Sequence, residues 1–221
     1  MLPDLSQFAR DNDIDAIGVA DVELLRFEEP AAMALVPEDL PRAVVLGIRL
    51  LDSIVNGIED RPTPLYFHLY RQTNFALDRK AHRLALKLQR DGYQAMTVPA
   101  SQIVDPRGRR GLVSHRLLGY AAGLGWIGRP TLLIHPRFGA RLRYVSILTD
   151  APYSPGDPMP NRCGECRACV HACPAGAIRD SSRDFDLDAC HRKLSEFRKL
   201  PFIGQHVCGI CVKACPGPAP V

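Results

Sequence analysis

The sequence has no apolar run long enough to cross a membrane, since its longest ones, AVVLGI and TLLI, have the length of β-strands. Its N-terminus, MLPDLSQFARDND, has no basic segment, no apolar segment and no twin arginine of the kind that marks a protein for export. These absences predict a cytoplasmic protein with no membrane partner. The apolar fraction of 46% and the charged fraction of 24% are typical of a globular chain that buries a core.

Cysteine is absent from the first 162 residues, and all eight cysteines lie between positions 163 and 215. The run CGECRACVHACP spaces four of them as C-x2-C-x2-C-x3-C with a proline directly after the last, and CGICVKACP follows near the C-terminus. In a cytoplasmic protein, cysteines at motif spacing bind metal more often than they form disulfides. Iron–sulfur clusters, structural zinc and disulfides are the three interpretations of such a pattern.

The spacing favours iron–sulfur clusters over zinc. A tetrahedral zinc site needs four ligands, usually two C-x2-C pairs, so the third cysteine of the first run would be surplus. In bacterial ferredoxins, the fourth cysteine of this run ligates the other cluster. The proline after Cys173 confines that cysteine to an extended backbone, which directs its thiol away from its own loop. The sequence therefore predicts two [4Fe–4S] clusters with crossed ligands, Cys163, Cys166, Cys169 and Cys215 for the first and Cys173, Cys190, Cys208 and Cys211 for the second.

Aspartate and glutamate are absent between residues 106 and 149, where eight arginines occur. Arginine matches phosphate and carboxylate geometry, so an anionic ligand is one interpretation of this segment. Solvated arginines around a tight turn and a nucleic-acid surface are two others. The segment includes AAGLGWIGRPTLLI, whose glycines allow close approach of the backbone to a ligand or to another strand. This run follows a predicted helix rather than a strand, so it does not match the dinucleotide-binding fingerprint.

Helical and strand patterns alternate before the cysteine-rich end. The patterns predict helices at 3–12, 64–91 and 112–123, and strands in DAIGVADV, RAVVLGIRL, QAMTVPA, TLLIHP and RYVSILT. In the long helix the predicted apolar stripe comprises Tyr66, Tyr70, Phe75, Leu77, His82, Leu86 and Leu88. The four prolines of APYSPGDPMPN indicate an extended linker. We therefore expect a mixed α/β (α+β) domain at 1–150, a linker at 151–161, and a ferredoxin-like domain with two clusters at 162–221.

These motifs, taken in order, resemble the superfamily of epoxyqueuosine reductases and reductive dehalogenases. The resemblance rests on AAGLGWIGRPTLLIHPRFGARLRYVSILTD, the proline-rich segment and the two cysteine runs with Cys190 between them, and IDAIGVADV and LPRAVVLGIRL extend it to the N-terminal part. It implies a nitroreductase-like first domain that binds cobalamin, with the ferredoxin-like domain supplying electrons. The cofactor-binding residues implied or predicted are Arg109, Arg116, Gly123, Gly125, Trp126, Gly128 and Thr131.

The expected function is that of a cobalamin-dependent reductase, which passes electrons through the clusters to reduce a small substrate or the corrinoid itself. The alternative is a two-cluster electron carrier that serves a partner enzyme and whose first domain binds FMN or docks that partner. A low-potential donor such as ferredoxin or flavodoxin is the expected electron source, and a homodimer is compatible with the sequence. The candidate proton donors are His115, Tyr70 and Asp105.

Two departures from the epoxyqueuosine reductases predict that tRNA is not the substrate. Where those enzymes place an aspartate proposed as proton donor, an ungapped count reaches Arg109, and Asp105 aligns only with a gap. Their Glu-Arg pair corresponds to His115-Arg116, so the arginine is kept and the acid is not. The sequence given also stops six residues after Cys215, before the helical-repeat region that holds tRNA in those enzymes.

Overall fold

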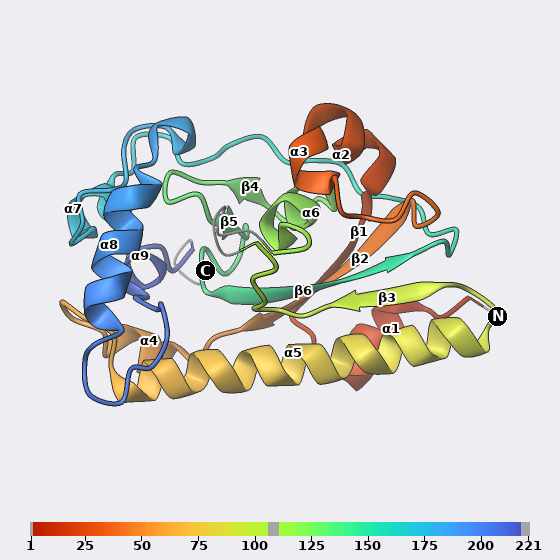
Figure 1. Ribbon diagram of the computed structural model, residues 1–221, viewed down its shortest axis with the longest axis horizontal. Helices are drawn as coiled ribbons and strands as arrows, with labels where there is room; N and C mark the ends of the chain where they lie inside the picture. The colour runs from red at the N-terminus through yellow and green to blue at the C-terminus, as the bar shows by residue number, and fades with distance from the viewer. Residues whose placement is uncertain (1, 106–110, 218–221) are drawn as a thin grey trace. The chain divides into compact units, whose positions relative to one another are not determined.

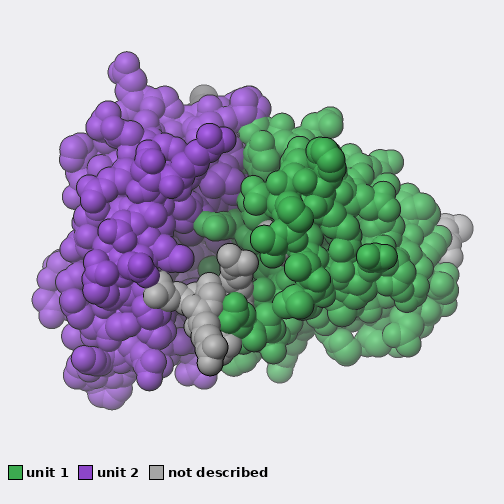
Figure 2. All heavy atoms as spheres, turned by 45° about the horizontal axis from the view of Figure 1, so that its top comes forward, with its two compact units in different colours: residues 1–48, 73–125, 143–159 green, residues 49–72, 126–142, 160–221 purple. Residues whose placement is uncertain are grey.

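The computed structural model describes residues 2–105 and 111–217. The chain divides into two compact units, each assembled from separate stretches of sequence and coloured separately in Figure 2. Unit 1 consists of residues 1–48, 73–125 and 143–159, and unit 2 of residues 49–72, 126–142 and 160–221. Unit 2 therefore combines the cysteine-rich end with two stretches that lie far before it in the sequence. The predicted functional domains remain predictions, since this division follows compactness alone.

Unit 1 is built around a four-stranded sheet in the order β1-β2-β6-β3 (Figure 1). Its strands are β1 (Ala16–Asp21), β2 (Arg42–Arg49), β6 (Leu142–Thr149) and β3 (Ala95–Val98). β1 runs antiparallel to β2, with Val19 opposite Val44, and β3 runs antiparallel to β6, with Thr97 opposite Ile147. The strands predicted at these positions are confirmed, and so is the mixed α/β fold class. TLLIHP forms only the two-residue strand β5 (Leu133–Ile134).

The long helix predicted over 64–91 is α5 (Pro64–Arg90), and its part in unit 1 covers one face of the sheet (Figure 1). Alternate residues of the strands point to that face, where four helix residues three or four positions apart meet them. The contact joins Leu77, Ala81, Leu84 and Leu88 to Val44, Leu46, Val145 and Ile147, all buried. The predicted stripe was wrong at Phe75, His82 and Leu86, which are all exposed, because these three residues lie on the side of the helix opposite Leu77 and Leu84.

The helix α6 (His115–Ala121) lies against β1 on the other face of the sheet. Gly18 of β1 permits this contact, because a Cβ there would lie 2.7 Å from the carbonyl oxygen of Ala122. Ser114 caps α6 by accepting from the amide of Leu117. Three short helices complete unit 1: α1 (Leu5–Asp11), α2 (Val22–Glu28) and α3 (Pro30–Met33). The proline-rich segment has neither helix nor strand, and its Ala151 and Tyr153 are buried in the core of unit 1.

Unit 2 contains the hairpin of β4 (Trp126–Ile127) and β5 and a set of short helices, three of which carry a cysteine. The helices are α4 (Asp52–Asn56), the first residues of α5, α7 (Ala168–Ala172), the 3₁₀ turn η1 (Ser182–Asp184), α8 (Leu187–Phe197) and α9 (Ile210–Lys213). An apolar cluster of buried side chains, including Ile58, Tyr66, Ile203 and Ile210, joins them. This core fixes the elements from which the thiols project.

Among the described residues, no helix combines the length and the apolar character that a membrane span requires.

Candidate metal centres

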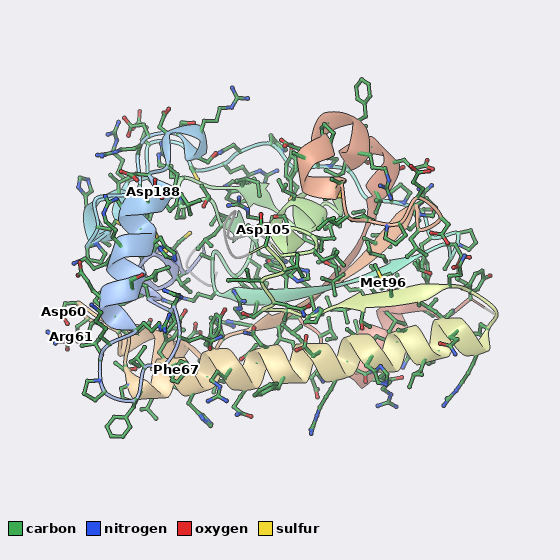
Figure 3. All side chains as sticks on the ribbon, viewed as in Figure 1. Asp60, Arg61, Phe67, Met96, Asp105 and Asp188 are labelled. Carbon is green, nitrogen blue, oxygen red and sulfur yellow. The ribbon has the colours of Figure 1, made fainter. Side chains whose placement is uncertain are left out.

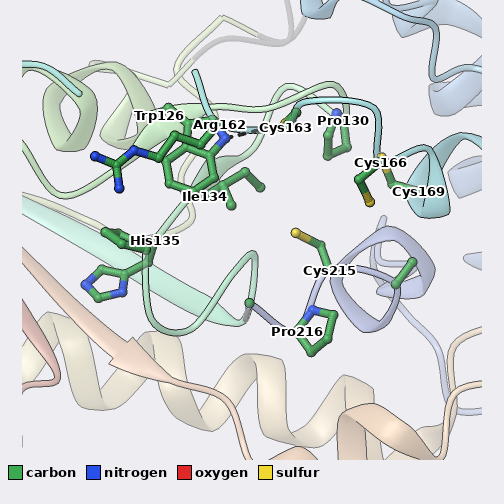
Figure 4. Close-up of a pocket in the computed structure, with 13 residues that line it drawn as sticks. Trp126, Pro130, Ile134, His135, Arg162, Cys163, Cys166, Cys169, Cys215 and Pro216 are labelled. Carbon is green, nitrogen blue, oxygen red and sulfur yellow. Dashed lines mark hydrogen bonds between the residues drawn. The ribbon is translucent and has the colours of Figure 1, made fainter. Parts of the chain in front are cut away.

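The thiols of Cys163, Cys166, Cys169 and Cys215 line one cavity of about 440 Å³ (Figure 4). Cys163 and Cys166 lie in the loop before α7, Cys169 lies within α7, and Cys215 follows α9. Figure 4 shows the Cys215 side chain reaching into this cavity from a different segment than the other three. Burial raises the pKa of Cys169, and the nearby thiols of Cys215, Cys163 and Cys166 raise it further. The fold therefore assembles the predicted first set of four.

The thiols of Cys173, Cys190, Cys208 and Cys211 form the second group. Burial raises the pKa of Cys208 to about 11, and the charges of Cys190 and Cys173 act in the same direction. Burial raises the pKa of Cys211, and the nearby thiols of Cys208, Cys190 and Cys173 raise it further. The thiols thus divide into the two predicted sets. Cys169 of the first set also raises the pKa of Cys211. The two groups are close enough to influence each other electrostatically.

The crossing of the two sets depends on the backbone at Cys173. This residue ends α7 in an extended conformation, with φ −69° and ψ 112°, as expected for a residue before proline. Cys169, four residues earlier, lies inside the helix. The thiols of Cys169 and Cys173 therefore serve different groups, and a symmetric arrangement holds at the other motif, where Cys211 lies within α9 and Cys215 follows it.

All eight cysteines are free thiols. Within residues 2–105 and 111–217, no three His, Cys, Asp or Glu side chains converge closely enough to share one metal ion. Four thiols instead surround a cavity, and soft thiolate ligands in sets of four are the donor type of [4Fe–4S] clusters. The donor set and the cavity are therefore compatible with a cluster at the first group.

The glycine-rich segment supports the first group from the side of the β4–β5 hairpin. The indole Nε1 of Trp126 donates to Cys163 Sγ at 3.4 Å. A Cβ at Gly128 would lie 2.6 Å from Cγ1 of Ile134 and 3.4 Å from Cys163 Sγ. Arg129 donates from Nη2 to the carbonyl oxygen of Gly164 at 2.7 Å. This part of the segment, expected to bind a cofactor, packs against the loop that holds the first cysteines.

The turn at 139–141 supports Cys215. The amide of Ala140 donates to the carbonyl oxygen of Cys215 at 2.9 Å. Gly139 has φ +58°, and a Cβ there would fall directly on the Cys215 carbonyl oxygen and the Gly217 amide. The turn thus holds the backbone of the last cysteine through a contact that only glycine allows.

Arg141 ties the same turn to α4 and α9. Its guanidinium is buried, and it pairs with Asp52 Oδ1 at 2.7 Å. Its Nη2 donates to Asn56 Oδ1 at 2.8 Å and to the Lys213 carbonyl oxygen at 3.1 Å. Lys213 in turn donates from Nζ to the carbonyl oxygen of Ile58. This network anchors α9, which bears Cys211 and leads to Cys215.

The roles of Gly139, Arg141 and Asp52 have no signal in the sequence. Arg141 was counted among the arginines of the acid-free segment, but its acidic partner lies 89 positions earlier in the chain. Arg143 similarly donates to Asn74 at 3.0 Å. The arginines of this segment are therefore used in several separate contacts, and their number alone does not define an anion site.

The structure favours a packing role for His115 over proton transfer. Its ring spans two partners in unit 1, with Nδ1 at 2.8 Å from Ser146 Oγ and Nε2 at 3.0 Å from the Pro99 carbonyl oxygen. The second contact requires a proton on Nε2, so Nδ1 of the neutral ring accepts from the serine. Burial lowers the pKa of His115 to about 4. The hydrogen bond to Pro99 opposes this shift, and the positive charge of Arg143 adds to it. The ring is neutral at neutral pH, and both its nitrogens are occupied.

Tyr70 and Asp105 are the other two candidate proton donors. Tyr70 packs at the edge of the apolar cluster around Ile203 in unit 2. Asp105 is half-buried in the loop before α6, where Figure 3 labels it. No proton donor is therefore assigned from these three, and their catalytic roles remain predictions.

The glycines predicted to cradle a corrinoid contact the protein itself. A Cβ at Gly123, which has φ +72°, would lie 2.7 Å from the Asp157 carbonyl oxygen. Gly125 also has a positive φ, and Thr131 adopts φ +56° in the turn between β4 and β5. Internal packing accounts for Gly123 and Gly128, so they give no independent sign of a corrinoid. Arg116 is exposed on α6, near the charge of Glu29, and Arg109 lies outside the described residues.

Three comparisons place these observations beside known proteins. Residues 158–179 match the family model described as 4Fe-4S binding domain. The chain is 32% identical over 192 residues to the epoxyqueuosine reductase of Gloeobacter violaceus, covering 78% of this chain and 57% of that protein. It is 31% identical over 114 residues to the epoxyqueuosine reductase of Bacillus anthracis, covering 48% of this chain and 30% of that one. The chain therefore spans between about a third and somewhat over half of these relatives.

Solved structures show the same fold. A catabolic reductive dehalogenase in complex with 3-bromo-4-hydroxybenzoic acid superposes with a TM-score of 0.70 and 22% identity, covering 92% of this chain and 30% of that one. An epoxyqueuosine reductase with a modified tRNA-Tyr stem loop superposes with a TM-score of 0.63 and 20% identity, covering 96% of this chain and 64% of that one. The mixed α/β fold with a ferredoxin-like segment is confirmed.

Proposed function

Because the chain belongs to the superfamily that contains the epoxyqueuosine reductases and the reductive dehalogenases, we propose that it carries two [4Fe–4S] clusters and passes electrons through them to a cobalamin bound by its N-terminal part. The chain is an iron–sulfur redox protein. The electrons would reduce a small substrate or the corrinoid itself. The observation that carries the proposal is the gathering of eight cysteines into two groups of four.

The clusters would supply one-electron redox chemistry, and the residues around them would fix their positions. Cys163, Cys166, Cys169 and Cys215 would hold the first cluster and Cys173, Cys190, Cys208 and Cys211 the second. A hydrogen bond to a cluster sulfur raises the reduction potential, so Trp126 would favour the reduced form of the first cluster through Cys163. The Arg141 network would keep α9 in place for both.

The support for cobalamin comes from the superfamily and not from a cradle in the described residues. A reductive dehalogenase is among the structural neighbours, and a fold likeness at 22% identity leaves the cofactor open. FMN in the N-terminal part, with the chain serving a partner enzyme as an electron carrier, is the alternative. Binding measurements with cobalamin and with FMN distinguish the two cofactors.

Reduction of epoxyqueuosine in tRNA is a second candidate function. It is favoured by the names of the curated relatives and by the neighbour that holds a modified tRNA stem loop. The sequence argued against it because Arg109 falls at the position of the family's aspartate. Turnover of an epoxyqueuosine-containing anticodon stem loop by the reconstituted chain would establish this function in place of the first.

Arg116→Gln tests the position of the cofactor. If the guanidinium contacts the phosphate of a corrinoid or of FMN, its loss removes one charge-assisted hydrogen bond, worth roughly 1.5–3 kcal/mol or about one to two decades in affinity. Cobalamin and FMN are titrated separately into wild type and variant, and the visible spectrum reports binding. The matched control is Arg90→Gln, which removes the same charge from an exposed position at the end of α5.

The expected result is weaker binding for Arg116→Gln alone, with the iron content of both variants unchanged. An equal dissociation constant in wild type and Arg116→Gln would remove Arg116 from the cofactor site. Spectra that respond to neither compound would support the electron-carrier alternative without a cofactor.

A further inference from the structure

The second half of α8 and the turn after it form an exposed basic surface. Arg192, Arg198 and Lys199 are exposed there, and Phe202 follows with 83% of its side chain exposed. Arg192 and Lys199 are seven residues apart, two turns of helix, so they share one side of α8 and its continuation. We call these four residues the α8 basic surface.

Acidic residues are few in the sequence around this surface. Between residues 189 and 203, Glu196 is the one acidic side chain against Arg192, Lys193, Arg198 and Lys199. Glu196 pairs with Lys193 at 2.5 Å, which leaves the other three cations in excess. The acidic residues of this region lie at the opposite end of α8, where Asp186 caps the helix and Asp188 follows (Figure 3). The charges are therefore separated along the helix.

The α8 basic surface is built on the element that holds the second thiol group. Cys190 lies in α8, and Cys208 follows the loop that carries Phe202. His191 follows Cys190 directly and His206 lies two residues before Cys208, and their rings stack with centroids 4.8 Å apart. Ser195 of α8 lies 3.2 Å from His206 Nε2. α8 and the chain segment before Cys208 are thus fastened together beside the second cluster site.

Phe202 is held outward by its backbone. It has φ +66°, a conformation that bulky residues rarely adopt, and the next residue, Ile203, is only 2% exposed. The buried isoleucine anchors the loop while the phenylalanine projects into solvent. Strained residues of this kind concentrate at functional sites, and aromatic residues and arginine are enriched at protein interfaces.

From this juxtaposition we propose that the α8 basic surface is the docking site of an acidic, low-potential electron-carrier protein, which delivers electrons to the second cluster. This inference rests on the proposed function. In each encounter the reduced carrier loses one electron and the second cluster gains it, so the carrier leaves oxidised by one equivalent. The first cluster, whose cavity is lined by Trp126 and Ile134 of the hairpin, would then receive the electron.

The test compares how fast a reduced acidic ferredoxin reduces the cluster-loaded chain. Steering by complementary charge raises association rates by factors of roughly 10 to 10³ and is lost at high ionic strength. Arg192→Gln/Arg198→Gln/Lys199→Gln should therefore lower the second-order rate constant about tenfold or more at low salt, with the difference shrinking as salt is added. Phe202→Ser should slow the reaction at both low and high salt, since it removes an apolar contact.

The matched control is Arg79→Gln/Arg83→Gln/Arg90→Gln, which removes three exposed positive charges from α5 and gives the same net charge. Reduction by methyl viologen radical, which needs no protein docking, should be equal in all variants and shows that the clusters are intact. If the triple α8 variant is reduced by ferredoxin as fast as wild type, the docking site is wrong. It is also wrong if the α5 control variant is slowed by the same factor as the α8 variant.

Failure of the inference is distinguishable from failure of the proposed function. If both clusters are present and methyl viologen reduces them, but the α8 changes do not affect ferredoxin, the relay stands and the surface does not. If the α8 changes instead weaken binding of an RNA stem loop and leave the ferredoxin rate unchanged, the surface serves nucleic acid and the inference is wrong.

Discussion

Cys173→Ala is expected to remove about half of the bound iron, leaving about four atoms per chain in one [4Fe–4S] cluster. Cys173 follows α7 in an extended conformation. Its thiol lies near enough to raise the pKa values of Cys190, Cys208 and Cys211. The second cluster would lose a ligand, whereas Cys163, Cys166, Cys169 and Cys215 would keep the first. Iron analysis and the EPR spectrum of the reduced protein measure the remaining cluster.

Double variants identify which cluster is lost. If the ligands cross, Cys173→Ala/Cys208→Ala removes two ligands of the same cluster and retains as much iron as Cys173→Ala alone. Cys173→Ala/Cys163→Ala then damages both clusters and loses nearly all iron. The opposite pattern would mean that each motif binds its own cluster. In that case Cys173→Ala/Cys163→Ala would keep about half of the iron, and Cys173→Ala/Cys208→Ala would lose nearly all of it. This non-additivity is the signature of shared sites.

Gly139→Ala is expected to abolish the first cluster and leave the second. An alanine Cβ would overlap the backbone carbonyl of Cys215 and the amide of Gly217, neither of which is the end of a flexible side chain. The segment after α9 must move away, and Cys215 with it. Iron should fall to about four atoms per chain, the amount in one [4Fe–4S] cluster.

Gly176→Ala is the matched control, because Gly176 has φ +57°, against +58° at Gly139, with no atom within 4 Å of the added Cβ. Both variants carry the cost of an L-residue in the left-handed region, roughly 1–2 kcal/mol. Only Gly139→Ala adds the collision. Full iron content in Gly139→Ala, or equal losses in the two variants, would show that the turn at 139–141 does not position Cys215.

The sequence was sufficient for features that depend on neighbours in the chain. The helix α5 follows from a run without glycine or proline, and the extended backbone at Cys173 follows from the proline after it. The grouping of thiols could be predicted because the ferredoxin spacing already encodes which cysteine crosses. Four short strands with buried faces were also found at their expected positions.

Features that depend on distant partners could not be predicted. Arg141 was placed in an acid-free segment, yet Asp52 compensates its charge after the chain folds. His115 was a candidate proton donor, but Ser146 and Pro99 occupy both nitrogens of its half-buried ring. The buried face of α5 was misjudged at Phe75, His82 and Leu86, because the sheet that α5 covers is assembled from strands on both sides of it in the sequence.

The compact units illustrate the same limit. Residues 49–72 and 126–142 carry no cysteine, and nothing in their composition links them to the ferredoxin-like end. These stretches join unit 2 through tertiary contacts, such as Ala140 with Cys215, Lys213 with Ile58 and the apolar cluster around Ile203. Contacts of this kind leave no spacing pattern that sequence analysis can detect.

The iron, sulfide and zinc content of the anaerobically reconstituted wild-type chain tests the central claim most directly. Two cubane clusters on eight cysteines predict about eight iron and about eight sulfide per chain, with zinc at trace level. Zinc as the dominant metal, or a maximum of about four iron and four sulfide per chain, would contradict the assignment of two [4Fe–4S] clusters.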